Sequence, residues 1–154
     1  MELIQNMQTN KNTVFVLKSS DSSQYFQNNT GKSFTCLLDQ PVEVYQGSKI
    51  GLREVLLSFS KGFSKKTVVI FDVLLKESVG CSDLSGNKTS ILRRVFVPVK
   101  RGDEFVLSSY NMLDFVALRP GYIEKFQISI DLLFPEDIKL HDTLETYLTL
   151  EVHH

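Results

Sequence analysis

The segment Tyr122–Phe134 reads YIEKFQISIDLLF and alternates apolar with polar residues. Its apolar positions lie mostly two residues apart, with one slip of phase: Ile123, Phe126, Ile128 and Ile130. Successive side chains of a β-strand point to opposite faces of a sheet. The spacing therefore predicts a strand with one buried face and one exposed face.

The same two-residue period recurs along the chain in segments rich in β-branched and aromatic residues. Thr67–Lys76 is nearly all apolar, which is typical of a strand buried on both faces. No segment has a sustained helical period, and the best candidate for a short helix is Leu107–Phe115. The other predicted strands are Thr13–Lys18, Lys32–Asp39, Ser48–Ser58, Ser90–Val97, Glu104–Leu107, Asp114–Leu118 and Leu144–Val152.

The number of these segments predicts the fold class. About eight strands without intervening helices favour an antiparallel sandwich or barrel. We therefore predict an all-β fold, an antiparallel eight-stranded β-sandwich with the topology of a single jelly roll. An immunoglobulin-like sandwich is the second choice, because such domains usually have a core tryptophan and this chain has none.

The length of 154 residues suits one domain with its own core. Residues 1–12 are polar and are predicted to form a flexible N-terminal arm, followed by a single jelly-roll domain over residues 13–154. The predicted core consists of Phe34, Cys36, Leu38, Ile50, Leu52, Val69, Phe71, Phe96, Phe126, Ile128 and Ile130.

The composition narrows the class of protein. Hydrophobic residues make up 42% and charged residues 23%, which is ordinary for a globular domain. No apolar run is long enough for a transmembrane helix and no signal peptide is visible, so we expect neither membrane insertion nor secretion. The net charge of −1 argues against a specific nucleic-acid binder. Cys36 and Cys81 are too few for a disulfide scaffold and are interpreted as thiols.

The charges are distributed unevenly along the chain. Residues 49–101 have a formal charge of +7, and residues 102–154 have −7. The fold could simply mix these charges over the surface. Alternatively, the subunit has a basic and an acidic side, which suits head-to-tail contacts in a ring of identical subunits. The candidate interface residues are Lys61, Lys65, Lys66, Arg93, Arg94, Lys100 and Arg101 on the basic side, and Asp103, Glu104, Asp131, Glu136, Asp137 and Asp142 on the acidic side.

Residues suited to catalysis or metal binding do not cluster in the sequence. A structural zinc site needs four converging ligands, and a nucleophile needs a nearby base. The chain has one internal histidine, His141, and two widely separated cysteines. We therefore predict a protein that is not an enzyme and that uses no cofactor, metal or small-molecule substrate.

The segment Phe34–Phe59 reads FTCLLDQPVEVYQGSKIGLREVLLSF. It resembles a pattern in virion proteins of Polinton/Maverick-type elements and the related adintoviruses. That pattern has an F-x-V-x-L strand, a segment led by proline, a glycine turn and a second strand. The matching parts of this chain are Phe34–Leu38, Pro41–Val44 and Lys49–Val55, and Arg119–Ile123 followed by Phe126–Ile130 resembles a later strand pair of the same proteins.

The resemblance implies a penton-like minor capsid protein with a single jelly roll. Its expected partners are further copies of itself, with a pentamer favoured over a trimer, and a major capsid protein. The expected location is the virion, assembled in the cytoplasm or nucleus of the host cell. A different class is left open, a lectin-like or tumour-necrosis-factor-like sandwich that acts in attachment or recognition, because fold alone does not decide function.

Overall fold

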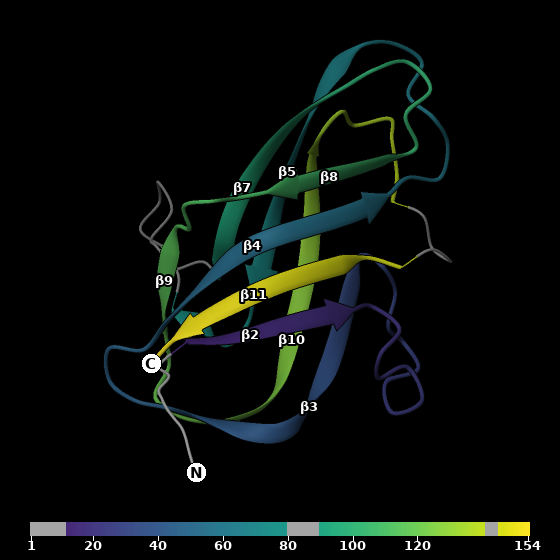
Figure 1. Ribbon diagram of the computed structural model, residues 1–154. Coiled ribbons are helices and arrows are strands. Elements are labelled where there is room, and N and C mark those ends of the chain that lie inside the picture. Colours follow the sequence, from purple (N-terminus) through teal and green to yellow (C-terminus); the bar gives the residue numbers. More distant parts are fainter. Residues whose placement is uncertain (1–11, 80–89, 141–144) are drawn as a thin grey trace.

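The computed structural model describes residues 12–79, 90–140 and 145–154, which form β-strands connected by turns and loops (Figure 1). Within these residues there is no helix, so the predicted all-β class is confirmed. The short helix predicted over residues 107–115 is wrong, because strand pairing continues to Ser109 and resumes at Phe115. Most of the predicted arm lies outside the described residues, and so does Cys81.

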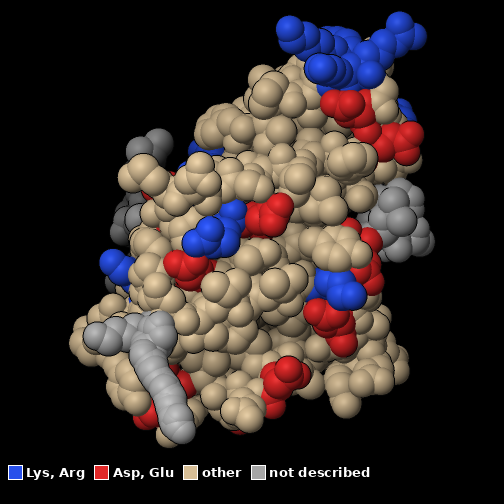
Figure 2. Space-filling view, viewed as in Figure 1, with Lys and Arg blue, Asp and Glu red and all other residues tan. Residues whose placement is uncertain are grey.

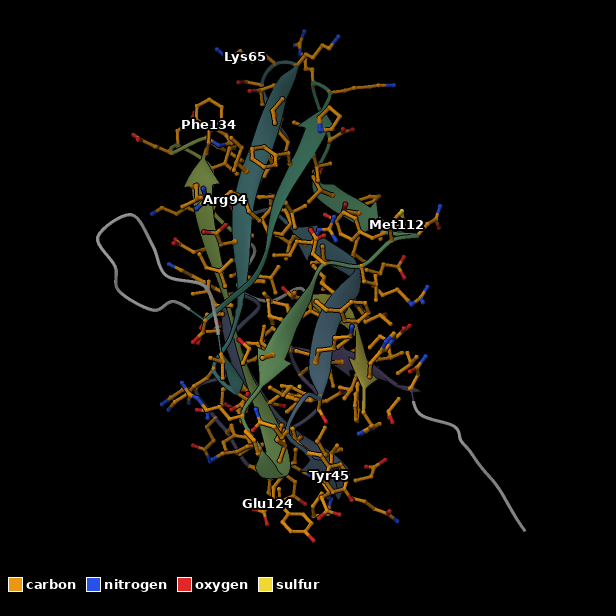
Figure 3. The ribbon with its side chains drawn as sticks, turned by 90° about the vertical axis from the view of Figure 1, so that its left-hand side faces the viewer. Tyr45, Lys65, Arg94, Met112, Glu124 and Phe134 are labelled. Carbon is orange, nitrogen blue, oxygen red and sulfur yellow. The ribbon has the colours of Figure 1, made fainter. Side chains whose placement is uncertain are left out.

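Two antiparallel sheets pack face to face as a β-sandwich, seen edge-on in Figure 3. The four-stranded sheet has the order β3 (Ser33–Val44), β10 (Gly121–Phe134), β5 (Thr67–Leu75) and β7 (Ile91–Val99). The six-stranded sheet has the order β2 (Asn12–Lys18), β11 (Tyr147–His153), β4 (Lys49–Ser58), β9 (Phe115–Leu118) and β6 (Ser78–Val79), with β8 (Phe105–Ser109) also paired to β4.

Ten strands lie in the described residues, where about eight were predicted. The strand that the sequence did not reveal is β6, which has only two residues and hence no period to detect. Strands β8 and β9 share one partner strand. The first pairs with the C-terminal half of β4 and the second with its N-terminal end.

Most strand pairs join one strand from the first half of the chain with one from the second half, at a similar distance from the middle of the sequence. The outermost pair is β2 with β11, and the next is β3 with β10. Inside these, β4 pairs with β8 and β9, and β5 pairs with β7. Three further pairs, β11 with β4, β10 with β5 and β6 with β9, complete the two sheets. Every element therefore depends on partners that are distant in sequence.

One hydrophobic core fills the space between the sheets. The predicted core residues of β4, β5 and β10 are buried, as are Phe34 and Cys36, and Leu38 packs at the margin. Phe126 in β10 has no exposed surface, and its ring meets that of Phe15 edge to face at 5.3 Å between centroids. The predicted phase of β10 is therefore confirmed.

Phe96 is the exception, because its side chain is 62% exposed. The register between β5 and β7 shifts between Val73 and Leu74, which leaves Leu92 without a partner. A bulge of this kind reverses the alternation of inward and outward side chains. Leu92 and Val95 are both buried as a result, and Phe96 points outwards. The sequence period alone did not reveal this slip.

The prediction that β5 is buried on both faces is also wrong. Its inward residues Val69, Phe71 and Val73 have no exposed surface, but Val68 on the outer face is 40% exposed. On the same face Ile70 and Leu74 are half-buried and Asp72 is buried beneath Arg94, while the sandwich has only two layers. One covered face is the usual arrangement for antiparallel sheets.

Candidate interaction surfaces

Five of the predicted basic residues gather at one end of the sandwich, and we call this cluster the basic tip (Figure 2). Three lie on the loop between β4 and β5, and two on the turn between β7 and β8. Backbone hydrogen bonds join these segments: the Phe63 N–H donates to the Asp103 carbonyl, and the Gly102 N–H donates to the Phe63 carbonyl. The basic tip consists of Lys61, Lys65, Lys66, Lys100 and Arg101.

The two segments of the basic tip approach each other so closely that a glycine is needed. A Cβ atom at position 62 would lie 2.9 Å from the carbonyl oxygen of Gly102. Gly62 therefore permits the contact that holds the two groups of cations together. All five cations are exposed, and none has an ion-pair partner within residues 12–79, 90–140 and 145–154.

The other two predicted basic residues lie in β7 and are engaged within the subunit. Arg94 donates two hydrogen bonds to the buried Asp72 carboxylate, at 2.7 and 2.9 Å, and these bonds raise the pKa of Arg94. Figure 3 shows Arg94 at the four-stranded sheet, away from the labelled Lys65 at the tip. The guanidinium carbon of Arg93 stacks 3.5 Å above the ring of Tyr110. Neither guanidinium group is a free charge.

Some of the predicted acidic residues lie beside basic ones. Asp131 is the register partner of Asp72, and it adds to the electrostatic attraction that raises the pKa of Arg94. The Asp103 carboxylate accepts a hydrogen bond from the Lys100 N–H at 2.8 Å and so belongs to the turn of the basic tip. Opposite charges that are far apart in the sequence are thus mixed by the fold.

The remaining acidic residues that are described also lie near the basic tip. Glu104 follows its turn, and the Glu104 carbonyl accepts a hydrogen bond from the Phe59 N–H at the end of β4. Glu136 and Asp137 lie in the loop after β10. Asp142 lies outside the described residues.

A pocket of about 380 Å³ lies beneath the basic tip. Phe63, Phe134 and Ile138 give it apolar walls, and Lys65 lines it together with the acidic pair Glu136 and Asp137. The Phe134 side chain is 46% exposed. An apolar floor bordered by both signs of charge is typical of a protein–protein contact, in which apolar side chains supply affinity and charges fix orientation.

A buried carboxylate lies on the outer face of the six-stranded sheet. Glu151 accepts hydrogen bonds from Arg53 at 2.6 and 3.0 Å, and the His153 Nε2 atom lies 2.5 Å from its second oxygen. The hydrogen bonds from His153 and Arg53 lower the pKa of Glu151. The His153 ring also packs against the ring of Phe115, with 4.3 Å between the ring centroids. This cluster holds β4, β9 and β11 together and was not predicted.

Figure 2 shows a small group of basic and acidic side chains in the middle of the outer face of the six-stranded sheet, with uncharged residues around it. Large apolar side chains are exposed on β2 and β8, among them Val16, Phe105 and Leu107. These side chains lie on either side of β11 and β4, so they form two separate apolar areas.

The described residues hold no group of three or more His, Cys, Asp or Glu side chains placed to bind a metal ion. No helix among them is long and apolar enough to span a membrane. No protein-family model and no curated protein sequence matches the chain. The fold, these surfaces and the sequence pattern of β3 and β4 are therefore the features of the chain that bear on its function.

Proposed function

We propose that the sandwich is a single jelly roll. The support is the pairing pattern. If β8 and β9 are counted as one interrupted strand and the two-residue β6 is set aside, the strands pair first with eighth, second with seventh, third with sixth and fourth with fifth. This is the arrangement of a long hairpin ribbon wound into two sheets, which contains two Greek keys.

We further propose that the protein has a structural role in a virion, as a penton-like minor capsid protein. The observation that carries the proposal is the combination of this strand order with the capsid-like pattern of Phe34–Phe59. That pattern covers β3, β4 and the turn between them, which is where the chain passes from one sheet to the other. Capsid proteins are among the proteins built on jelly rolls. Such a role needs no catalytic residues and no cofactor.

The proposed assembly is a ring of identical subunits, five in preference to three, which binds a major capsid protein and is assembled inside the host cell. The basic tip and the pocket beneath it are the surfaces we assign to subunit contacts, with Glu136 and Asp137 as the acidic partners. The free charges of the basic tip would steer association, and exposed apolar residues would supply affinity. No nucleic acid, membrane or small molecule is part of this proposal.

The mass of the native oligomer tests the proposal. Five copies in sedimentation velocity support the ring, and a monomer at every concentration overturns it. Reversal of charge at Lys65 and Lys66 to Glu should weaken the oligomer. The matched control reverses two exposed lysines outside the basic tip, Lys76→Glu with Lys125→Glu, and should leave it intact.

The oligomer number also tests the other class of function. Three copies would favour a tumour-necrosis-factor-like or lectin-like module, since lectin domains also use jelly rolls. Binding to an array of immobilised glycans would then distinguish a lectin-like module from a virion spike.

A further inference from the structure

One edge of the six-stranded sheet has unpaired backbone groups. At the end of β2, the Lys18 N–H donates to Asp21 Oδ2 and the Lys18 carbonyl accepts from the Cys36 thiol, so both groups point away from β11. The register between β2 and β11 is uninterrupted. Because backbone direction alternates along an antiparallel strand, the N–H and C=O groups of Val14 and Val16 point to the same free edge. Within the described residues nothing pairs with them.

Proteins usually protect such an edge. In this chain the neighbouring edge strand of the four-stranded sheet, β3, is protected by side chains. In β3 the side-chain amide of Asn29 bonds to both the N–H and the carbonyl of Thr35, and Ser22 Oγ accepts from the Leu37 N–H. The edge of β2 has no such cover. Residues 13–17 include no charge, proline or bulge. Val14 and Val16 are 53% and 67% exposed, so the edge has the features that favour pairing with another strand.

A groove of about 890 Å³ runs along this edge. It is lined by β2 on one side and by residues 36–42 of β3 on the other. Phe15, Leu38 and Val42 contribute apolar side chains to it. The neighbouring β3 closes the far side, so the groove has room for one extended segment beside β2. This is the geometry in which a peptide adds a strand to a sheet.

We propose that this groove binds residues 1–11 of a second copy of the chain, which pair with β2 as an additional strand. The inference builds on the proposed homo-oligomer. Eleven residues precede β2 in the sequence, and an extended segment of that length reaches up to about 36 Å, which is enough to cross to a neighbour. Met1, Leu3 and Met7 fall at odd positions, so an extended strand would place them on one face, towards the groove.

The strand could in principle come from the same subunit or from a neighbour, and the proposed ring, which places copies side by side, favours the neighbour. A hairpin would need a turn at Thr9-Asn10-Lys11, directly before Asn12. Asparagine, like glycine, readily adopts the positive φ angles of short hairpin turns, so Asn10 keeps a hairpin within one subunit as the alternative that the mixing experiment tests. A neighbouring copy removes the need for the turn. The contact would tie subunits together through backbone hydrogen bonds at Val14 and Val16.

Amide hydrogen exchange measured by NMR tests the proposal residue by residue. The two samples are the full chain and a variant that lacks residues 2–10. The Val14 and Val16 amides should exchange at least about tenfold more slowly in the full chain. The amides of Thr13, Phe15 and Leu17 point to β11 and are the internal control, with equal exchange in both samples. Equal exchange of the Val14 and Val16 amides in both samples would overturn the proposal.

A mixing experiment identifies the source of the strand. Isotope-labelled truncated protein is mixed with unlabelled full chain. Protection of the labelled Val14 and Val16 amides shows that the segment comes from another copy. If the labelled amides of the truncated protein stay unprotected although labelled full chain, measured alone, shows protection, the segment folds back within its subunit and the proposal is wrong.

A synthetic peptide of residues 1–11, added to the truncated protein, separates this inference from the ring. If the full chain forms a dimer or an open assembly and the peptide protects Val14 and Val16, the strand pairing is supported and the ring is refuted; a monomeric full chain refutes both. If the full chain forms a ring and neither the arm nor the peptide protects these amides, the ring stands and the groove proposal fails.

Discussion

Replacement of Phe126 by alanine should be among the most destabilising single changes in this protein. The ring has no exposed surface, lies in the middle of the four-stranded sheet and packs edge to face on Phe15. Loss of a buried phenylalanine costs about 3–5 kcal/mol, from lost hydrophobic transfer and from the cavity left behind. Domains of this kind have total stabilities of about 5–15 kcal/mol, so Phe126→Ala should remove a large part of the whole.

Urea unfolding followed by circular dichroism gives the free energy of unfolding of each variant. Phe96→Ala is the matched control, because the same side chain lies 62% exposed in the same sheet. It should change stability by less than about 0.5 kcal/mol. Phe126→Leu retains most of the volume and provides a folded variant if the alanine variant does not fold. A cost below about 1 kcal/mol for Phe126→Ala, or equal costs at the two positions, would refute the reasoning.

Two substitutions and one labelling experiment test other parts of the structure. Gly62→Ala places a Cβ 2.9 Å from the Gly102 carbonyl and should cost about 1–3 kcal/mol in thermal or urea unfolding; no change would mean that the loops do not touch. The pKa of Glu151 is lowered by its hydrogen bond with His153, so its contribution to stability is full above about pH 4.5 and is lost as the pH falls further. Unfolding of Glu151→Gln across pH should therefore show a shallower acid decline than the parent protein, and parallel curves would contradict this. Burial raises the pKa of the Cys36 thiol to about 12, so iodoacetamide should modify it only after unfolding; rapid labelling in the native state, located by mass spectrometry, would disprove its burial.

The two-residue period of apolar residues within each strand predicted most of the fold, because this period indicates which face of a strand is buried. The alternation in Tyr122–Phe134 placed Phe126, Ile128 and Ile130 correctly in the core. It failed at Phe96, where a bulge in the register reverses the phase without changing the composition of the strand. A register shift depends on the partner strand, which one strand's sequence does not contain.

Charge in the sequence proved a poor guide to charge on the surface. The sequence separates basic from acidic residues into two long blocks, but strand pairing brings Arg94 next to Asp72 and Asp131. The basic tip, by contrast, forms because two loops meet, and only the glycines at positions 62 and 102 hinted at that contact. Contacts between loops of this kind depend on the order of the strands in the sheets, which the spacing of apolar residues does not specify.

The pairing of the first described strand with the last has a consequence for biosynthesis. Asn12 is the register partner of His153, so among the described strands β2 has no neighbour in its sheet until β11 has been made. During translation β4 could pair with β8 and β9, whereas β2 would wait for β11, the strand that joins it to β4. Folds dominated by such distant pairings form slowly and expose strand edges on the way. A chain that lost β11 would therefore lose an inner strand of a sheet, and cells that make this protein would benefit from keeping chains apart until β11 has been made.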